Sequence, residues 1–173
     1  MGYAEVGIGK DAPNSVNVII EIGAFQSPIK YELDKHTGVL HVDRFLFTPM
    51  QYPCNYGYVP QTLCDDGDPA DVLVITPHPL QPGVVVESRL IGVLEMTDEQ
   101  GGDYKLLAVP TSKLTTLYDD VHEPTDLPVA LLNQIKHFFE HYKDLEPNKW
   151  VKIEGWLDAA TAIERLDSSR QSA

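Results

Sequence analysis

Apolar residues along this chain recur mostly with the two-residue period of β-strands. Val16 to Ile22 is rich in apolar, β-branched residues and predicts a strand, and Ile29 to Leu33 alternates strictly. In the second strand, Lys30 and Glu32 should therefore share one face. Glu21 is unusual inside an apolar strand. An edge position facing water would explain it, and so would a functional role.

Short apolar runs bounded by turn residues predict further strands. They are expected at Val39 to Val42, Val72 to Ile75, Val84 to Val86, Leu90 to Met96, Leu106 to Val109 and Trp150 to Trp156. Between two of these runs, Glu99-Gln100-Gly101-Gly102 is typical of a hairpin turn. Asp103 and Lys105 follow this turn two positions apart, so they should lie on one face of their strand.

A helical period is clear in one long segment, Pro124 to Glu146. Asp126 is its expected N-cap. Its apolar stripe comprises Leu131, Ile135, Phe138 and Tyr142. A second, short helix is expected from a cap at Asp158 to about Leu166, followed by a frayed tail over residues 167–173. The pattern predicts a mainly β fold of the α+β class, in a single domain over residues 1–173.

The acidic loop Asp65-Asp66-Gly67-Asp68-Pro69-Ala70-Asp71 is the most distinctive stretch, with a carboxylate at four of its positions. Its glycine and proline exclude a helix. Carboxylates this close repel one another unless their pKa values rise, water solvates them or a cation binds. Oxygen ligands suit Mg²⁺, Mn²⁺ or Ca²⁺, although a solvated acidic turn also fits. The glycine and the downstream glutamate are misplaced for an EF-hand, which excludes that motif.

A second acidic pair, Asp98 and Asp103, is accompanied by basic and phenolic residues elsewhere in the chain. The phenols between Tyr52 and Tyr58 either pack around a bend or donate to phosphate oxygens, and the basic residues are either solvated charges or an anion clamp. The candidate phosphate ligands are Lys30, Arg44, Tyr56, Lys105, Tyr142 and Lys143. Such groups beside metal-binding carboxylates favour a phosphate ligand. Because the sequence has no glycine-rich nucleotide loop, we expect a small, highly charged phosphate.

The overall charge narrows the choice of partner. The formal net charge of −13 argues against a general nucleic-acid binder, which needs a basic face. It fits a protein that takes up divalent cations, and it equally fits ordinary acidic solubility. No apolar run approaches the length of a membrane span, and the N-terminus lacks the layout of a signal peptide. We therefore expect a cytoplasmic protein in which Cys54 and Cys64 are free thiols.

The segment His137-Phe138-Phe139-Glu140-His141 matches the H-x-x-E-H pattern of inverzincin metalloproteases. Those enzymes need a third protein ligand from a further glutamate on another helix, and only one short helix is expected to follow. Since Phe138 belongs to the predicted core stripe, the two histidines should lie off the core. A surface or subunit interface is the favoured explanation.

Taken together, these motifs resemble one family, the family I soluble inorganic pyrophosphatases in their short bacterial form. The stretch Asp66-Gly67-Asp68-Pro69-Ala70-Asp71-Val72 is similar to the family signature D-x-D-P-x-D-V. The likeness recurs in Ile29-Lys30-Tyr31-Glu32, in Val42-Asp43-Arg44, in Tyr52-Pro53-Cys54-Asn55-Tyr56-Gly57-Tyr58 and from Lys136 to Lys143. It runs from about Lys10 to Trp156, over motifs too widely separated to agree by coincidence.

The resemblance implies a closed, OB-like β-barrel flanked by two helices, a homohexamer, and hydrolysis of pyrophosphate to two orthophosphates with Mg²⁺. Matched position by position, Asp66, Asp71 and Asp103 would bind the tightest metal, and Asp66 would share a second. Metals that arrive with the substrate would be held by Asp98 and Asp103, with help from Glu21 and Glu32. Asp68 would be the general base that accepts the proton of the attacking water. The six candidate phosphate ligands would bind the substrate.

Two other functions remain compatible with the residues. One is a non-catalytic OB-type module that binds nucleic acid or sugar, which the charge and the carboxylate cluster oppose. The other is a metal-dependent phosphatase that acts on organic phosphates. Phosphate release from pyrophosphate with Mg²⁺, compared with release from sugar and nucleotide phosphates, separates the three functions.

Overall fold

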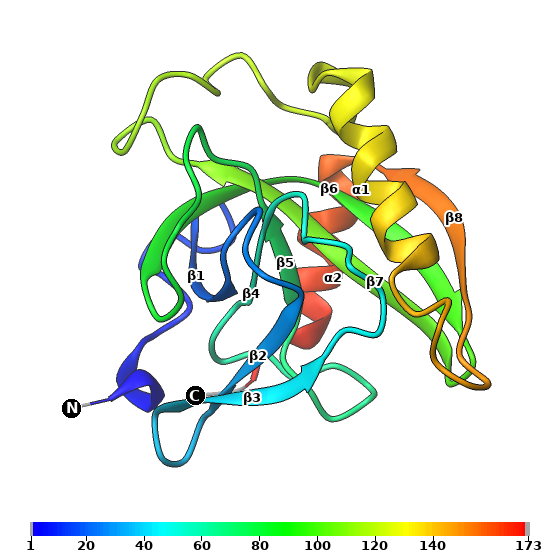
Figure 1. The fold of residues 1–173 in the computed structure, drawn as a ribbon. Coiled ribbons are helices and arrows are strands. Elements are labelled where there is room, and N and C mark those ends of the chain that lie inside the picture. The colour runs from blue at the N-terminus through cyan, green and yellow to red at the C-terminus, as the bar shows by residue number, and fades with distance from the viewer. Residues whose placement is uncertain (1, 172–173) are drawn as a thin grey trace.

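The computed structural model describes residues 2–171 of the 173-residue chain. Its strands are β1 (Val16–Ile22), β2 (Ile29–Asp34), β3 (Val39–Phe45), β4 (Asn55–Tyr58), β5 (Asp71–Val74), β6 (Val85–Asp98), β7 (Gly101–Pro110) and β8 (Val151–Leu157). Its helices are the 3₁₀ turns η1 (Tyr3–Glu5) and η2 (Pro124–Asp126) and the α-helices α1 (Val129–His141) and α2 (Ala159–Ser169) (Figure 1). The predicted mainly β fold with two helices is confirmed.

A six-stranded sheet forms the body of the molecule, in the order β1-β4-β5-β7-β6-β8. Neighbouring strands are antiparallel except for β5 and β7, which are parallel. β1 also pairs with β6, from Val16 opposite Ser88 to Ile19 opposite Val85. Strand pairing therefore leads from β1 through β4, β5, β7 and β6 back to β1, and β8 extends the sheet beside β6. We refer to these five mutually paired strands as the ring.

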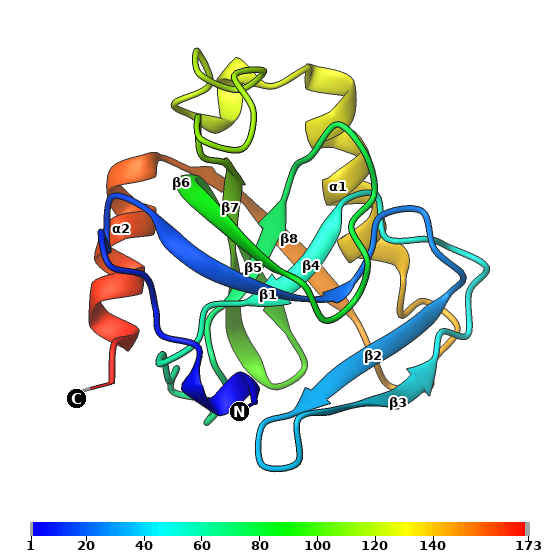
Figure 2. The same cartoon turned by 90° about the vertical axis from the view of Figure 1, so that its left-hand side faces the viewer.

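β2 and β3 form a separate two-stranded sheet that projects from the ring on the side away from α2 (Figure 2). Lys30 lies opposite Arg44 in its register, and the register shifts between Lys30 and Tyr31. At the far end of β2, the fully buried Leu33 packs with Ile19 of the ring. Leu33 thus anchors one end of the hairpin, Leu46 is buried just after β3 at the other end, and Lys30 and Arg44 lie near that second end.

Two apolar clusters fill the molecule, one under α1 and one under α2. α1 buries Leu132, Ile135, Phe138 and Phe139. The predicted stripe is correct in direction but incomplete: Leu131 packs against the core while only half-buried, and the fully buried face also takes in Leu132 and Phe139. Tyr52 packs its ring against that of Phe138, with 4.5 Å between the centroids. Such aromatic pairs stabilise a core by about 0.5–1.5 kcal/mol beyond the area that they bury.

The predicted bounds of the first helix are wrong at both ends. Asp126 does not cap α1; its carboxylate accepts hydrogen bonds from the backbone N–H groups of His122 and Glu123 and so caps η2. The chain then runs extended through Leu127 and Pro128, so α1 can begin only at Val129. It ends at His141, and the residues up to Glu146 form turns rather than further helix.

α2 shows the expected N-cap but a different C-terminal end. The Asp158 carboxylate accepts a hydrogen bond from Thr161 N at 2.9 Å, which confirms the predicted cap. The helix continues past Leu166 to Ser169, whose carbonyl accepts a hydrogen bond from Leu63 N at 2.7 Å. The predicted frayed tail is therefore wrong for residues 167–171. Backbone hydrogen bonds and the bridge between Thr62 and Arg170 hold the end of α2 against the segment that precedes the acidic loop. Residues 172 and 173 of that tail lie outside the described residues.

Two strands predicted separately, Val84 to Val86 and Leu90 to Met96, are continuous in β6. A register shift between Leu90 and Gly92 accommodates the change of partner along this long strand. A Cβ at Gly92 would collide with Pro124 and with the Leu157 carbonyl, so β8 and η2 can approach β6 closely only because of this glycine. The closing strand begins at Val151 rather than at Trp150.

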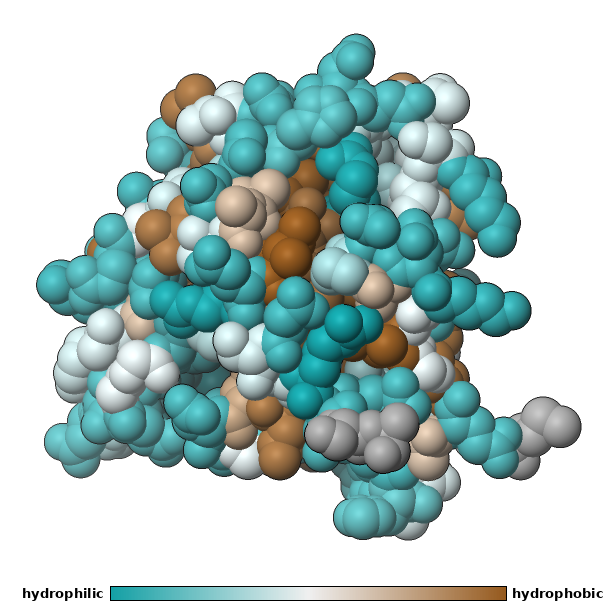
Figure 3. Space-filling view, turned by 180° about the vertical axis from the view of Figure 1, so that it is seen from behind, coloured by the Kyte–Doolittle hydropathy of each residue, from teal (hydrophilic) through white to brown (hydrophobic). Residues whose placement is uncertain are grey.

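The side on which α2 lies has a mostly hydrophilic surface, with apolar residues exposed mainly in a central area (Figure 3). Among the described residues, no helix has the length and apolar character that crossing a membrane requires. Cys54 is buried and Cys64 half-buried, and both are free thiols, as predicted.

Candidate active site

A cavity of about 490 Å³ opens between the ring and the β2–β3 hairpin. Its lining is unusually rich in charged side chains of both signs and in tyrosines. The residues that line it are Glu21, Lys30, Glu32, Lys35, Arg44, Tyr52, Tyr56, Tyr58, Asp66, Asp68, Pro69, Asp71, Asp98, Gln100, Gly102, Asp103, Lys105, Phe139, Tyr142 and Lys143.

Every residue that the sequence put forward for catalysis, metal binding or substrate binding lies in this lining. These are Asp68; Asp66, Asp71, Asp98, Asp103, Glu21 and Glu32; and Lys30, Arg44, Tyr56, Lys105, Tyr142 and Lys143. They come from β1, the hairpin, β4, the acidic loop, β5, β6, β7 and the C-terminal end of α1. The structure thus brings them to one place, while the role of each remains a prediction.

The acidic loop is held in shape by its own backbone. The N–H of Cys64 donates to the Asp68 carbonyl at 2.7 Å, and the N–H of Gly67 donates to the Cys64 carbonyl at 3.0 Å. The Asp68 N–H donates to the Asp66 carboxylate at 3.0 Å. Gly67 has a φ of +89°, which favours glycine at the tip of the loop. Asp66 and Asp68 are therefore exposed to the cavity on a loop with a fixed backbone.

Lys105 is the buried cation of the site. Its Nζ lies 2.6 Å from an Asp71 oxygen and 3.1 Å from an Asp103 oxygen, and it donates to the Tyr56 hydroxyl at 3.2 Å. Burial alone would lower the pKa of Lys105, but Asp71 and the other groups around it hold that pKa well above its usual range. Lys105 stays charged and fixes two carboxylates of the cavity on one side.

The tyrosines of the site are protonated donors. Burial raises the pKa of Tyr142 to about 12 and that of Tyr56 well above its usual value. Gly57, between Tyr56 and Tyr58 on β4, has no room for a Cβ, which would overlap the Ile19 carbonyl. The close approach of β4 to β1 therefore places both flanking phenol rings at the cavity. The tyrosines serve the core as well, so both explanations offered for these phenols apply.

Glu21 is buried, so the alternative of a water-facing edge position is wrong. It lies on β1 between β4 and the hairpin, and its carboxylate accepts a hydrogen bond from Leu33 N at 2.9 Å. Burial is the largest cause that raises the pKa of Glu21, to about 7, and Asp71 contributes in the same direction. A carboxylate placed this deep beneath a charged cavity is not explained by packing.

On the strands of the hairpin, Lys30 and Arg44 each have an acidic partner. Lys30 Nζ lies 3.0 Å from Asp43, and the Arg44 guanidinium pairs with Glu146 in the turn after α1. These side chains are about a quarter to a third exposed, apart from the more deeply buried Glu146. They are anchored cations that can still reach a ligand in the cavity.

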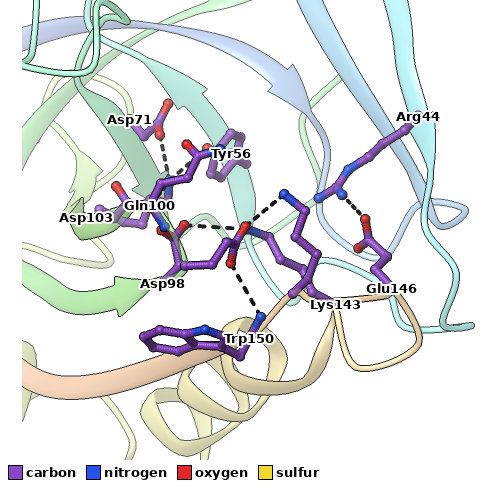
Figure 4. A network of polar contacts seen from close by, with 12 residues as sticks. Arg44, Tyr56, Asp71, Asp98, Gln100, Asp103, Lys143, Glu146 and Trp150 are labelled. Carbon is purple, nitrogen blue, oxygen red and sulfur yellow. Dashed lines mark hydrogen bonds and ion pairs between the residues drawn. The ribbon is translucent and has the colours of Figure 1, made fainter.

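A polar network links the β6–β7 hairpin to the residues after α1 (Figure 4). Lys143 Nζ lies 3.6 Å from Asp98 and 4.0 Å from Glu99, and Glu99 also accepts a 2.8 Å ion pair from Lys149. Partial burial of Glu99 would raise its pKa, but hydrogen bonds from Lys149 and from backbone N–H groups lower that pKa to about 2. Glu99 thus fixes Lys143 and stands directly beside the predicted ligand Asp98.

Several residues of the site were not predicted from the sequence. Lys35 lines the cavity, with its Nζ 5.2 Å from the centre of the Tyr58 ring. Gln100 also lines it, and Glu99 and Glu146 pair with its cations. A signal existed for Glu99, which sits beside Asp98 in the acidic hairpin turn. No local pattern distinguishes Glu146 from a surface glutamate.

The oxygen donors of the cavity fit a hard divalent cation. Asp71 and Asp103 reach the same ammonium group, and Asp66 and Asp68 line the same space. Within residues 2–171, no three His, Cys, Asp or Glu side chains already converge as a metal cage. Mg²⁺ fits such a site, because it keeps several waters and is usually bound through one or two carboxylates.

The two histidines of the helix motif that resembles a metalloprotease do not line this cavity. His137 and His141 have their ring centres 4.6 Å apart on the exposed flank of α1, off the core as predicted. His141 Nδ1 lies 2.8 Å from Asp144 and Nε2 lies 3.7 Å from Glu140. His137 lines a shallow apolar groove with Phe25 and Met50 instead.

A family model described as inorganic pyrophosphatase matches residues 18–173. The inorganic pyrophosphatase of Pseudomonas aeruginosa is 62% identical over 162 residues, covering 94% of this chain and 93% of that protein. That of Escherichia coli is 57% identical over 173 residues, covering 100% and 98%. The crystal structure of the inorganic pyrophosphatase from Thermus thermophilus superposes with a TM-score of 0.91 at 40% identity, covering 98% of this chain and 97% of that one.

Proposed function

This chain belongs to the inorganic pyrophosphatase family, and we propose on that basis that its cavity hydrolyses pyrophosphate to two orthophosphates with bound Mg²⁺. Its relatives match over nearly their whole length, so the chain is an inorganic diphosphatase, a hydrolase of a phosphoric anhydride. The observation that carries the proposed mechanism is that the acidic and basic candidates share one cavity. The acidic set suits cations, and the basic set suits phosphate oxygens.

The proposed cation ligands are Asp66, Asp71 and Asp103 for the tightest Mg²⁺, and Asp98 with Asp103 for those that come with substrate, assisted by Glu21 and Glu32. Bound there, Mg²⁺ would lower the pKa of a coordinated water from about 15.7 toward roughly 7 and neutralise phosphate charge. Support comes from the all-oxygen donor set and from Lys105, whose ammonium group contacts both Asp71 and Asp103 and offsets the repulsion between them.

Asp68 is the proposed general base. It lines the cavity on a loop whose backbone is fixed, between the predicted ligands Asp66 and Asp71 in sequence. A carboxylate in that position reaches a water held by its neighbours and accepts the proton that the water loses as it attacks phosphorus. A positioned base of this kind contributes about 10²- to 10⁴-fold to a rate.

The phosphate groups are held by Lys30, Arg44, Tyr56, Lys105, Tyr142 and Lys143 in this proposal. The raised pKa values of Tyr56 and Tyr142 support it, because a phenol that keeps its proton can donate to a phosphate oxygen. The lysine and arginine groups stabilise the negative charge that builds up on the leaving phosphate. All six side chains line the same cavity, which supports a shared role in binding one ligand.

Further parts of the proposal concern the whole molecule. The ring of paired strands supports an OB-like closed barrel, because β1 pairs with both β4 and β6. We also propose that residues 1–173 form a single domain, that the protein is cytoplasmic, that it does not bind nucleic acid, and that it assembles as a homohexamer. The flank of α1 that carries His137 and His141 is the proposed subunit contact, since both side chains lie off the core.

Phosphate release is the experiment that tests this function. With Mg²⁺ present, the protein should release phosphate from pyrophosphate and not from sugar phosphates or nucleoside monophosphates. Mg²⁺ without substrate should raise the melting temperature, because it binds the folded chain and relieves repulsion between the aspartates. Ca²⁺ should inhibit, since its larger radius and looser coordination would misplace the water. Full activity in excess chelator would exclude the metal-dependent mechanism.

A further inference from the structure

Glu146 is an acidic residue that stands behind the cavity rather than in it. It lies in the turn after α1 and does not line the cavity. Its carboxylate nevertheless forms an ion pair with Nη1 of Arg44, and Arg44 does line the cavity (Figure 4). The Glu146 side chain is 10% exposed and that of Arg44 is 27% exposed. The two residues are 102 positions apart in the chain, so the pair joins the hairpin to the end of α1.

The second oxygen of Glu146 has no hydrogen-bond partner within residues 2–171, although it is buried. Buried carboxylate oxygens are normally paired, because an unpaired one loses its hydration without compensation. The counter-charge that the structure gives Glu146 is therefore the Arg44 guanidinium. Burying this carboxylate with one oxygen unpaired costs free energy, so its ion pair with Arg44 explains its presence better than packing does.

Arg44 is held from two sides. Its guanidinium carbon lies 5.9 Å from the centre of the Tyr142 ring, and Glu146 binds one end of the guanidinium. A guanidinium has five N–H donors, of which this pair uses one. Because Arg44 lines the cavity and Glu146 does not, the remaining donors are available on the cavity side.

The location of Arg44 makes such a restraint necessary. It lies on β3, opposite Lys30, in a sheet that is not paired with the ring. The buried anchor of that sheet is Leu33, at the opposite end of β2. Just after β3, Leu46 is buried in the apolar cluster under α1, and Thr48 Oγ1 donates to the Tyr142 carbonyl at 3.4 Å. These contacts hold the backbone beside Arg44, but they do not orient its side chain. Without Glu146, the Arg44 side chain would be free to sample other rotamers.

We propose that Glu146 is a positioning residue, which fixes the Arg44 guanidinium at the edge of the cavity so that its free N–H groups meet a phosphate group of the substrate. This inference rests on the proposed function. Glu146 touches neither substrate nor metal, and it acts only through Arg44. The unpaired oxygen lets the ion pair change from one hydrogen bond to two as Arg44 adjusts to the phosphate.

A double-mutant cycle tests the inference, with Glu146→Gln, Arg44→Gln and the two combined. Glu146→Gln keeps the size of the side chain and removes its charge. It should lower kcat/KM for pyrophosphate by about ten- to a hundredfold, the size of effect expected when a binding group is misplaced by about 1 Å. Most of the loss should be in KM, and inhibition by inorganic phosphate should weaken by a similar factor. In the Arg44→Gln background, the same change should alter kcat/KM by less than about twofold.

Controls separate positioning from stability. Glu164→Gln, on the exposed face of α2, should leave both KM and phosphate inhibition unchanged. If Glu146→Gln does not fold, Glu146→Asp replaces it in the cycle, because it keeps the charge but withdraws the carboxylate by one methylene. It should show the same loss in KM that disappears without Arg44.

The outcomes distinguish the inference from the function on which it rests. If the wild type is active and Glu146→Gln lowers kcat/KM equally in the wild-type and the Arg44→Gln backgrounds, the inference alone is overturned. The same holds if Glu146→Gln lowers the melting temperature but leaves KM and phosphate inhibition unchanged. A wild type that does not hydrolyse pyrophosphate would overturn the proposed function, and the inference with it.

Discussion

The two walls of the cavity are built in different ways. One wall is the ring, where Asp71 on β5 and Asp103 on β7 share the buried Lys105, above strands whose apolar side chains are fully buried. The other is the hairpin, whose Val42 and Phe45 are 52% and 65% exposed. Its cations, Lys30 and Arg44, are each held by one acidic partner.

This difference matches what each wall is proposed to bind. Mg²⁺ requires near-ideal ligand distances of about 2.0–2.1 Å, which suits Asp71 and Asp103, because their strands cannot shift without disrupting the core. Pyrophosphate is larger and has rotatable bonds, so cations on a less constrained hairpin can adapt to it. The comparison predicts that changes on the ring wall will affect metal binding and chemistry, whereas changes on the hairpin wall will affect substrate affinity.

The largest effect is expected at the acidic loop. Asp68→Asn should fold and bind Mg²⁺ but lose about 10²- to 10⁴-fold in kcat, because the general base is removed. Asp65→Asn is the matched control: it lies in the same loop but outside the cavity lining, and should retain most of the activity. Steady-state kinetics across pH measures both. Near wild-type rates for Asp68→Asn at every pH would show that another group is the base.

Glu21 should make the stability of the metal-free protein depend on pH. Its pKa is about 7 in the folded chain and about 4.5 when unperturbed, so the unfolded state loses its proton first as the pH rises. The free energy of unfolding should therefore fall between pH 4.5 and 7, and Glu21→Gln should remove that fall. The relative gain of the variant is up to about 3 kcal/mol, at about 1.4 kcal/mol per pKa unit.

Urea unfolding in excess chelator at several pH values measures this dependence. The exposed Glu164→Gln should follow the wild-type curve. Parallel curves for Glu21→Gln and the wild type would mean that Glu21 has the same pKa in the folded and unfolded states. In that case, its burial beneath the cavity would not have the electrostatic consequence described here.

The hairpin wall should show a smaller, binding-type effect. Lys30→Gln should raise KM for pyrophosphate by about tenfold, equivalent to about 1.4 kcal/mol, with a smaller change in kcat. Lys113→Gln, in an exposed loop away from the cavity, is the charge-matched control. If Lys30→Gln instead lowered kcat with KM unchanged, the distinction between a metal wall and a substrate wall would be lost.

The smallest effect is expected at the proposed subunit contact. Protonation of His137 and His141 as the pH falls should weaken association, because like charges then meet across the contact. Asp144 and Glu140 beside His141 balance part of that charge, so the effect should be modest and arise mostly from His137. Sedimentation from pH 8 to pH 5 should show that the double variant His137→Gln/His141→Gln dissociates at a different pH. Dissociation at the same pH would make these histidines ordinary surface residues.

Local patterns predicted the acidic loop, the alternating strands and the hairpin turn of this site, whereas the roles of its individual residues came from the family resemblance. The apolar alternation of β2 placed Lys30 and Glu32 correctly, and both line the cavity. The sequence pattern did not predict the burial of Glu21, which depends on the hairpin that covers β1. It also did not predict the ion pair of Glu146, whose partner is 102 residues away. The start of α1 was misjudged because Asp126 caps a 3₁₀ turn whose hydrogen bonds compete with the helix.

A Mg²⁺ titration of pyrophosphate hydrolysis, made on the wild type, Asp71→Asn and Lys30→Gln, tests the distinction between the two walls most directly. Loss of a direct ligand should raise the half-saturating Mg²⁺ concentration of Asp71→Asn by about a hundredfold, the upper range seen for changes around metal sites. Lys30→Gln should need the same Mg²⁺ concentration as the wild type, within about twofold, and differ only in its KM for pyrophosphate. Equal Mg²⁺ requirements in all three proteins, or a larger shift for Lys30→Gln than for Asp71→Asn, would contradict the account.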